Sequence, residues 1–341
     1  MSLGQYPAVR VTKPFAFQAS SAQIAHVAFL FLVFTTTAVP AVSTAYKSPL
    51  RHLQNPSKKQ NAAIGNPEPY MNEPLKQLSK EIPELKGIHP AENEQQLPLI
   101  LKRTGEEIDE FFKGIVDLEA REEIEQERSS GHGNSRRASP LRDSYIIVRQ
   151  GDDKDANFDE FRMDAHGNRL SEEDLGRGFL VTSGFALICV EFSTGHQIDS
   201  RYKYLGDQKV GGKDTYVVAF AQLPIVDNLA ITLRGPNGTE AHMFTQGIAW
   251  VDKENFHILR IRTDLLGPQA DIGLDQQTTK VDFSEIRFAD VSMPLWLPRE
   301  VQVYVKLRKS AERIVDLEFR NVHHYSNYRR YRVSTQMVVP K

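Results

Sequence analysis

The sequence predicts an α+β protein that is mainly antiparallel β: a large curled sheet or unclosed β-barrel of about ten strands, covered by an N-terminal amphipathic helix. Three observations lead to this prediction. Apolar residues recur at steps of three and four over residues 97–115, and after residue 143 they alternate with polar residues in short runs. Turn residues, such as those at 235–238, separate these runs where a βαβ fold would need helices. We therefore expect an antiparallel meander.

Composition and charge limit the classes of partner. The chain has 341 residues, of which 40% are apolar and 25% charged, as in a globular protein with a sizeable core. Its net charge of −2 gives no overall attraction for nucleic acid, and we expect no nucleic-acid partner. The single cysteine, Cys189, excludes an intramolecular disulfide or a cysteine-rich metal site, and its apolar surroundings in sequence predict a buried thiol.

The first 45 residues are predicted to form a signal peptide. Arg10 and Lys13 precede an uncharged apolar run over residues 24–42, and Ser43 and Ala45 stand at the small-residue positions of a cleavage site. An uncleaved membrane anchor is the alternative, because roughly 19 residues just span a bilayer. No cysteine follows the apolar run, so a lipid-modified N-terminus is not expected. We expect an exported protein, periplasmic or secreted, whose membrane association after cleavage is peripheral at most.

After the signal peptide, the sequence divides into a polar tether, one ordered domain and a short tail. The tether is rich in Pro and Asn and shows neither a helical nor a strand period, so we expect it to be disordered. The expected boundaries are 46–81 for the tether, 82–333 for a single domain with a helix at about 92–115, a loop at 129–142 and strands over 143–333, and 334–341 for the tail.

The clearest strands are residues 300–308 and 314–320, which alternate strictly and predict a hairpin. The arginine- and tyrosine-rich run 320–332 is predicted to be a final edge strand protected by its charges. Contact of Arg329 and Arg330 with anionic headgroups or an acidic partner is the alternative. Shorter strands are predicted at 144–150, 158–163, 201–205, 215–221, 230–233, 247–252, 257–262 and 281–288.

Four segments together resemble a known group of proteins. They are PELKGIHPAENEQQLPLILKRTGEEIDEFF (83–112), REEIEQER (121–128), GKDTYVVAF (212–220) and GIAWVDKENFHILRIR (247–262). With the export signal, this combination resembles bacterial envelope proteins of the outer-membrane lipoprotein carrier-like superfamily, over roughly residues 82–333. The resemblance implies an unclosed β-barrel whose concave face, lidded by helices, accepts acyl chains or a partner protein. No local motif allows site residues to be transferred one by one.

The sequence contains no catalytic signature, and we expect neither an enzyme nor a cofactor. His323 and His324 look like a metal-binding pair, but adjacent residues of a strand point to opposite faces, so surface histidines are expected and no metal site. The acidic run at 151–161 lacks the order of a calcium loop and predicts an acidic turn. No G-x-S-x-G sequence is present.

Two functions remain as hypotheses. In the first, a half-barrel binds a hydrophobic ligand, with a lipid or lipoprotein as partner. In the second, the protein is an interaction or structural module of the envelope with a filled core and another envelope protein as partner. An apolar cavity of roughly 300 to 1,000 Å3 under the helix would favour the first. The predicted lining residues are Trp250, Leu259, Ile261, Val301, Val303, Val305, Leu317, Phe319, Phe111 and Phe112.

Overall fold

A computed structural model describes most of the chain after residue 68. The described residues are 69–115, 117–130, 135–150, 157–171, 184–224, 231–234, 240–270, 273–289, 291, 293–308 and 316–331. The predicted signal peptide, residues 46–68 of the predicted tether and the tail at 334–341 lie outside this part of the chain.

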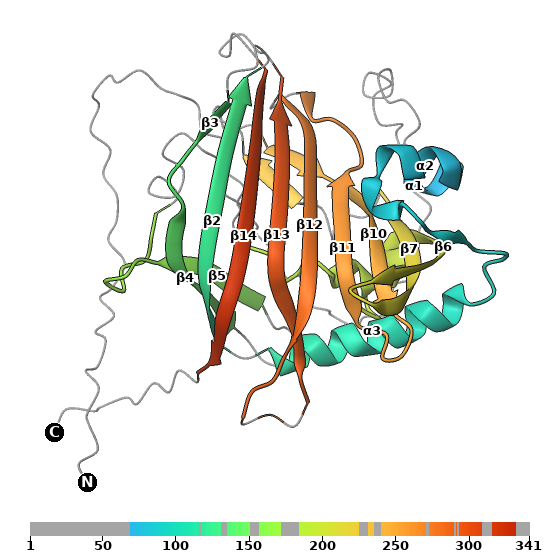
Figure 1. The fold of residues 1–341 in the computed structure, drawn as a ribbon, viewed down its shortest axis with the longest axis horizontal. Coiled ribbons are helices and arrows are strands. Elements are labelled where there is room, and N and C mark those ends of the chain that lie inside the picture. The colour runs from blue at the N-terminus through green and yellow to red at the C-terminus, as the bar shows by residue number, and fades with distance from the viewer. Residues whose placement is uncertain are drawn as a thin grey trace, which may run out of the picture.

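One twelve-stranded antiparallel sheet dominates the described structure (Figure 1). A separate pair consists of β8 (Ile231–Arg234) and β9 (Glu240–Met243). The strands of the large sheet are β1 (His89–Pro90), β2 (Leu118–Ser130), β3 (Ser135–Arg137), β4 (Leu141–Gln150), β5 (Asn157–Met163), β6 (Ser200–Val210), β7 (Lys213–Gln222), β10 (Thr245–Asp252), β11 (Ile258–Leu265), β12 (Leu274–Ile286), β13 (Leu295–Leu307) and β14 (Leu317–Arg330).

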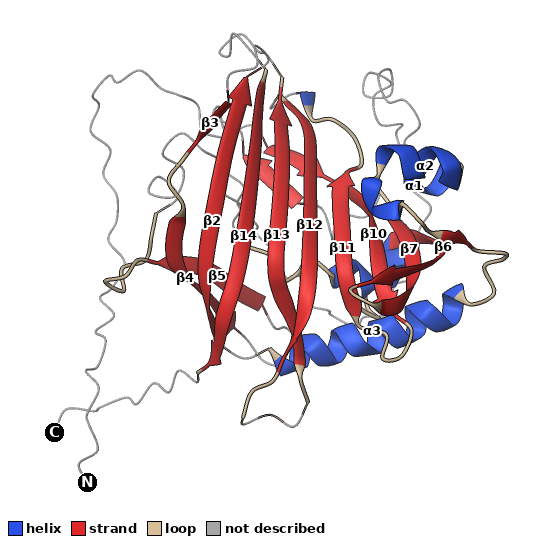
Figure 2. Ribbon diagram, in the orientation of Figure 1, coloured by secondary structure: helices blue, strands red, loops and turns tan. Residues whose placement is uncertain are grey.

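The order of the strands is β1-β6-β7-β10-β11-β12-β13-β14-β2-β4-β5, with β3 also paired to β2. The path runs from β1 to β5 without closing, so the fold is an unclosed barrel or curled sheet, and the predicted fold class is confirmed (Figure 2). From β10 to β14 the strands follow one another as the expected meander. The meander is broken where β2, early in the sequence, pairs with β14.

The pairing of β2 corrects two predictions. Apart from the two-residue β1, the domain's strands begin at Leu118 rather than at residue 143, and residues 135–137 and 141–142 of the predicted loop belong to β3 and β4. In addition, β14 is an internal strand between β13 and β2, not an edge. Both errors have the same cause: Glu122 and Gln126 occupy buried positions of β2, so the strand does not alternate between apolar and polar residues.

The prediction of a disordered tether is wrong for residues 69–81. This segment forms α1 (Pro69–Asn72) and α2 (Leu75–Glu81), which lie against the sheet near β6 and β7 (Figure 1). The side chain of Leu78 is fully buried, and the hydroxyl of Tyr70 donates a hydrogen bond of 2.6 Å to Asp264. Tertiary burial of a few apolar side chains therefore orders a segment whose local composition is typical of disorder.

Two apolar clusters cover opposite faces of the sheet. The larger one lies on the face that we call the inner face, which carries Ile261, Val301 and Val303. The smaller one lies between α1, α2 and the other face of β6, β7 and β10. Trp250 belongs to the smaller cluster, where it is fully buried and its indole N–H donates to Gln208 at 2.7 Å.

The predicted amphipathic helix is α3 (Leu97–Gly114), which starts five residues later than expected. It crosses one end of the strands, close to β13 and β6 (Figure 2). Its buried stripe faces residues 184–199, which we call the cover segment and which contain the short helices η2 (Val190–Phe192) and η3 (Gln197–Asp199). Gly105 allows the close approach, because a Cβ atom there would lie 3.1 Å from the carbonyl oxygen of Phe192.

We expect Trp250→Ala to lower the free energy of unfolding by about 3–5 kcal/mol, because it empties a large, fully buried site. Urea unfolding followed by circular dichroism measures this loss. Leu99→Ala is the control: this side chain is 54% exposed, and its removal should change stability by less than about 0.5 kcal/mol. A loss below about 1 kcal/mol for Trp250→Ala would contradict the assignment of Trp250 as a packing anchor.

Candidate binding site on the inner face

A row of facing side chains crosses the inner face. Ile261, Val281 and Val301 are direct cross-strand partners on β11, β12 and β13, and each is buried. The row continues from Val301 to His323 on β14 and then to Ile124 on β2. Such pairs pack against one another, so this row forms an apolar wall that His323 interrupts. The next row on the same face is more polar and runs from Thr263 through Thr279 and Val303 to Asn321.

The predicted lining residues do not form one group. Trp250 lies in the smaller cluster on the opposite face, so the sequence-based set cannot line a single pocket. Leu259 is buried but belongs to neither cluster. The remaining eight lie in or against the inner-face cluster: Ile261, Val301, Val303, Val305, Leu317, Phe319, Phe111 and Phe112. The separation of Trp250 from Ile261 follows from strand geometry, because Ile261 faces Ala249 rather than Trp250.

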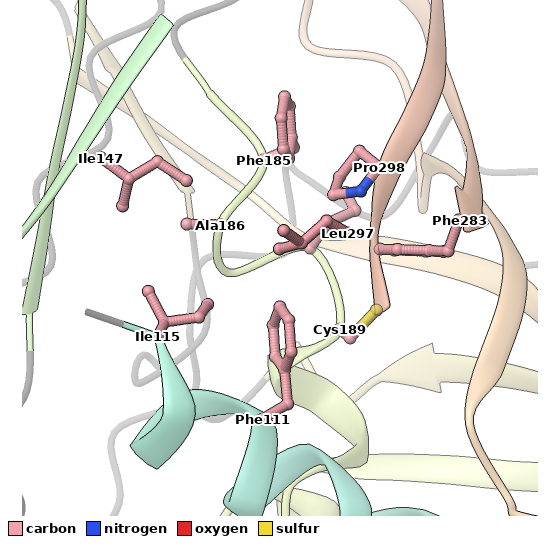
Figure 3. A pocket seen from close by; sticks show the side chains of 10 residues that line it. Phe111, Ile115, Ile147, Phe185, Ala186, Cys189, Phe283, Leu297 and Pro298 are labelled. Atoms are coloured by element: carbon pink, nitrogen blue, oxygen red, sulfur yellow. The ribbon is translucent and has the colours of Figure 1, made fainter. Parts of the chain in front are cut away.

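The apolar cavity beneath α3 is small. Phe111 of α3, Ile115 just after it, Phe185 and Cys189 of the cover segment, and Leu297 of β13 surround it (Figure 3). Its volume is about 10 Å3, which is room for one water molecule and far below the size of a ligand pocket. The thiol of Cys189 is buried here, as predicted, and burial raises its pKa well above the usual value.

The cover segment is fixed at its start by a partly buried carboxylate. Glu160 on β5 accepts hydrogen bonds from the backbone N–H groups of Phe185, at 2.9 Å, and Ala186, at 3.2 Å. Gly184 packs directly on this carboxylate, since a Cβ atom there would lie 2.1 Å from Glu160 Oε2. Side chain to backbone bonds, rather than strand pairing, therefore hold the first residues of the segment in place.

The end of the cover segment is attached to α3. The side-chain amide of Gln197 donates to the carbonyl oxygens of Leu101 and Phe192, each at 2.8 Å. The backbone N–H of Thr194 donates to Asp109 Oδ1 at 3.2 Å. As a result, α3 and the cover segment form one covering layer.

Two carboxyl groups at this layer, those of Glu191 and Glu160, form no ion pair with any side chain in the part of the chain that the structure describes. Glu191 in η2 is buried and accepts a hydrogen bond from the amide of Gln222 at 3.1 Å. Burial raises the pKa of Glu191 to about 7, and burial likewise raises the pKa of Glu160 to about 7. Near neutral pH, both groups titrate where the covering layer meets the sheet.

A fully buried ionic cluster lies beside the apolar wall. We define it as Glu122 of β2, Arg162 of β5, and His323 and Tyr325 of β14. Glu122 Oε2 accepts from Arg162 Nε at 2.5 Å, and Oε1 accepts from Arg162 Nη2 at 2.9 Å. Oε1 also accepts from His323 Nδ1 at 2.8 Å and from the Tyr325 hydroxyl at 2.6 Å. One carboxylate thus joins three strands of the sheet.

The protonation states in the ionic cluster follow from burial and from these bonds. Burial alone would raise the pKa of Glu122, but the Arg162 guanidinium and the bond from His323 hold it well below its usual range. Burial lowers the pKa of His323, so its imidazole is neutral. Because Nδ1 donates to Glu122, the tautomer leaves a lone pair on Nε2. Within the described structure this Nε2 atom is buried and has no hydrogen-bond partner.

The sequence-based reading of the histidine pair is correct for His324, which is exposed, and wrong for His323, which is fully buried. The alternation in β14 does predict that the two residues face opposite ways. What the sequence analysis missed is the ionic cluster itself. The only sequence feature that points to this cluster is Glu122 at a buried position of β2. It predicts a buried ionic contact only once β2 is known to pair with β14.

Phe185 of the cover segment closes the ionic cluster. Its ring stacks on Tyr145 with centroids 4.9 Å apart and meets Tyr325 edge-on at 4.7 Å. The guanidinium of Arg162 also lies over the ring of Tyr145, at 5.5 Å from its centroid. Removal of the cover segment would therefore uncover Tyr145 and the Tyr325 side of the ionic cluster.

Comparisons with known proteins find neighbours among solved structures. No family model and no curated protein match the chain. The chain is similar to a domain from Vibrio parahaemolyticus described as an outer membrane lipoprotein-sorting protein: 13% identity, TM-score 0.33, covering 67% of this chain and 91% of that one. It is also similar to a DUF1329 family protein from Desulfovibrio piger: 14% identity, TM-score 0.33, covering 70% and 94%.

The description of this chain as an unclosed barrel rests on its own strand order. None of the helices in the described part of the chain is long and apolar enough to cross a membrane.

We expect Glu191→Gln to change the pH dependence of stability. The pKa of this carboxyl is about 7 in the folded state and near 4.5 in the unfolded state. Its contribution to the free energy of unfolding is therefore complete below pH 4.5 and is lost as the pH rises through 7. Relative to the variant, the wild type should lose on the order of 3 kcal/mol of unfolding free energy between pH 4.5 and 8. Chemical denaturation across this range measures it, and parallel profiles would contradict the assignment.

Arg162→Met should lower stability by about 3–5 kcal/mol, because it leaves the buried carboxylate of Glu122 without its cation. Arg169→Met is the matched control, since its ion pair with Asp159 is largely exposed and worth less than about 1 kcal/mol. Thermal or urea unfolding of both variants tests the difference. Equal losses would show that burial of the ionic cluster is incomplete in solution.

Proposed function

We propose that this protein is a non-enzymatic envelope protein that binds a hydrophobic ligand, a lipid or acyl chain, on the inner face of its half-barrel. One observation carries the proposal: the apolar side chains of β11 to β14 share one cluster with those of α3 and the cover segment, and this covering layer is held by side chain to backbone hydrogen bonds. The export signal predicted from the sequence supports a periplasmic or secreted location. A lipid or lipoprotein is the proposed partner.

Ligand binding on this wall requires the covering layer to move, because the cavity beneath it holds only about 10 Å3. Segments held by few specific bonds open at lower free-energy cost than paired strands. The bonds of Glu160 and Gln197 supply such specific attachments at the two ends of the cover segment. Once the layer opens, Val301, Val303 and Phe319 would offer apolar surface to an acyl chain.

A protein interaction or structural module of the envelope is the second candidate. The filled interior favours it, since a cavity of about 10 Å3 is what a permanently packed core leaves. In this case α3 and the cover segment never leave the sheet, and the exposed side of α3 is the available surface. The two candidates differ in one measurable property, which is reversible uptake of an apolar probe.

We expect delipidated protein to bind a fluorescent fatty acid saturably, and unlabelled fatty acid to displace it. Gly184→Ala should raise the probe affinity about three- to tenfold, because a methyl group 2.1 Å from Glu160 Oε2 disturbs the attachment and increases the open fraction. Gly195→Ala, in open space within the same segment, should leave the affinity unchanged. Absence of a displaceable signal from both wild type and Gly184→Ala would favour the filled-core module.

A further inference from the structure

We infer that His323 and Gln126 form a binding site for the secondary amide of an N-acylated ligand. The inference rests on the proposed binding of acyl chains to the inner face and adds the polar group that this face would recognise. It starts from buried hydrogen-bonding atoms that have no partner within the described residues: Nε2 of His323, Nε2 of Gln126 and the hydroxyl of Tyr145.

The positions of these atoms match the shape of an acylated ligand. His323 stands in the apolar row between Val301 and Ile124. Gln126 faces Asn321, which lies two residues from His323 on the same face of β14, so Gln126 and His323 are diagonal neighbours. Diagonal side chains on one face lie roughly 7–8 Å apart at the backbone and come closer at their tips. A single amide group can bridge that separation while its acyl chain follows the apolar wall.

The hydrogen-bonding roles select an amide. The neutral imidazole of His323 donates from Nδ1 to Glu122, so Nε2 accepts a hydrogen bond. The amide nitrogen of Gln126 donates. A secondary amide supplies the matching N–H and C=O groups, whereas an ester supplies only an acceptor. Burying the ester would leave the lone pair of His323 without a donor, which costs free energy.

The charge of the surroundings selects a neutral group. The carboxylate of Glu122 is balanced by Arg162, and His323 is uncharged, so the ionic cluster has no net charge. Asp143 faces Glu122 on β4, and burial raises the pKa of its carboxyl. A phosphate or free carboxylate placed here would meet Glu122 and Asp143 without a spare cation. The ligand's charged groups must therefore lie outside this site.

Access depends on Phe185, whose ring lies on both Tyr145 and Tyr325. Opening of the covering layer removes this ring together with the rest of the cover segment. Because the imidazole of His323 is stacked with the ring of Tyr325, at 6.3 Å between centroids, the same movement would open a path to His323. In the closed state, these atoms are buried without hydrogen-bond partners, which lowers the stability of that state. Binding of an amide would supply the missing hydrogen bonds.

The test uses two ligands with the same chain, N-methyldodecanamide and methyl dodecanoate, each displacing the fluorescent fatty acid from the full protein. We expect the wild type to bind the amide about tenfold more tightly than the ester, which corresponds to about 1.4 kcal/mol. His323→Leu should reduce this ratio to about one. Gln126→Met, which keeps the length of the side chain, should weaken amide and ester alike about fivefold.

His324→Leu is the matched control, because this neighbouring side chain is exposed on the other face. It should leave both affinities unchanged. Equal binding of amide and ester by the wild type would overturn this inference and leave the proposed function standing. An unchanged ratio in folded His323→Leu or an unaltered ester affinity in Gln126→Met would also overturn it. Failure of the wild type to bind the probe at all would remove the proposed function and this inference together.

Discussion

The pairing of β14 with β2 is the interaction on which the rest of the structure depends. It joins segments about 200 residues apart in sequence and places β4 and β5 at the end of the sheet. Its register also assembles the ionic cluster, because Tyr325 faces Glu122 and His323 faces Ile124. A slip by one residue would turn Glu122 away from Arg162 and put charged side chains on the apolar wall. The buried ion pair therefore makes the register specific.

The covering layer has a different physical character from the sheet beneath it. The strands are held by ladders of backbone hydrogen bonds, while the cover segment is held by side-chain hydrogen bonds, such as those of Glu160, Gln197 and Asp109, and by aromatic contacts. Buried carboxyl groups with a pKa of about 7 make the attachment sensitive to pH. The sheet and its covering layer are therefore held by two different kinds of interaction.

Much of the fold could be predicted from the sequence, because many of its elements are defined by the local pattern of apolar and polar residues. Where apolar and polar residues alternate, as in residues 300–308, the strand can be recognised without knowledge of its partners. The amphipathic period of α3 is local in the same sense. The strand β2 could not be found in this way, because the partners of its buried polar residues lie in strands distant in sequence: Arg162 of β5 and His323 of β14 contact Glu122, and Asn321 of β14 faces Gln126.

The separation between β2 and β14 also has a consequence for folding during synthesis. The ribosome completes β2 long before Phe319 and His323 emerge, so this long strand has an unoccupied edge for most of translation. Unpaired apolar strands are prone to aggregate, and polar residues in them act as gatekeepers. Glu122 and Gln126, with the charged residues on the opposite side of β2, would keep the strand soluble until β14 is synthesised and pairs with it. The residues that later define the interior thus also protect the nascent chain.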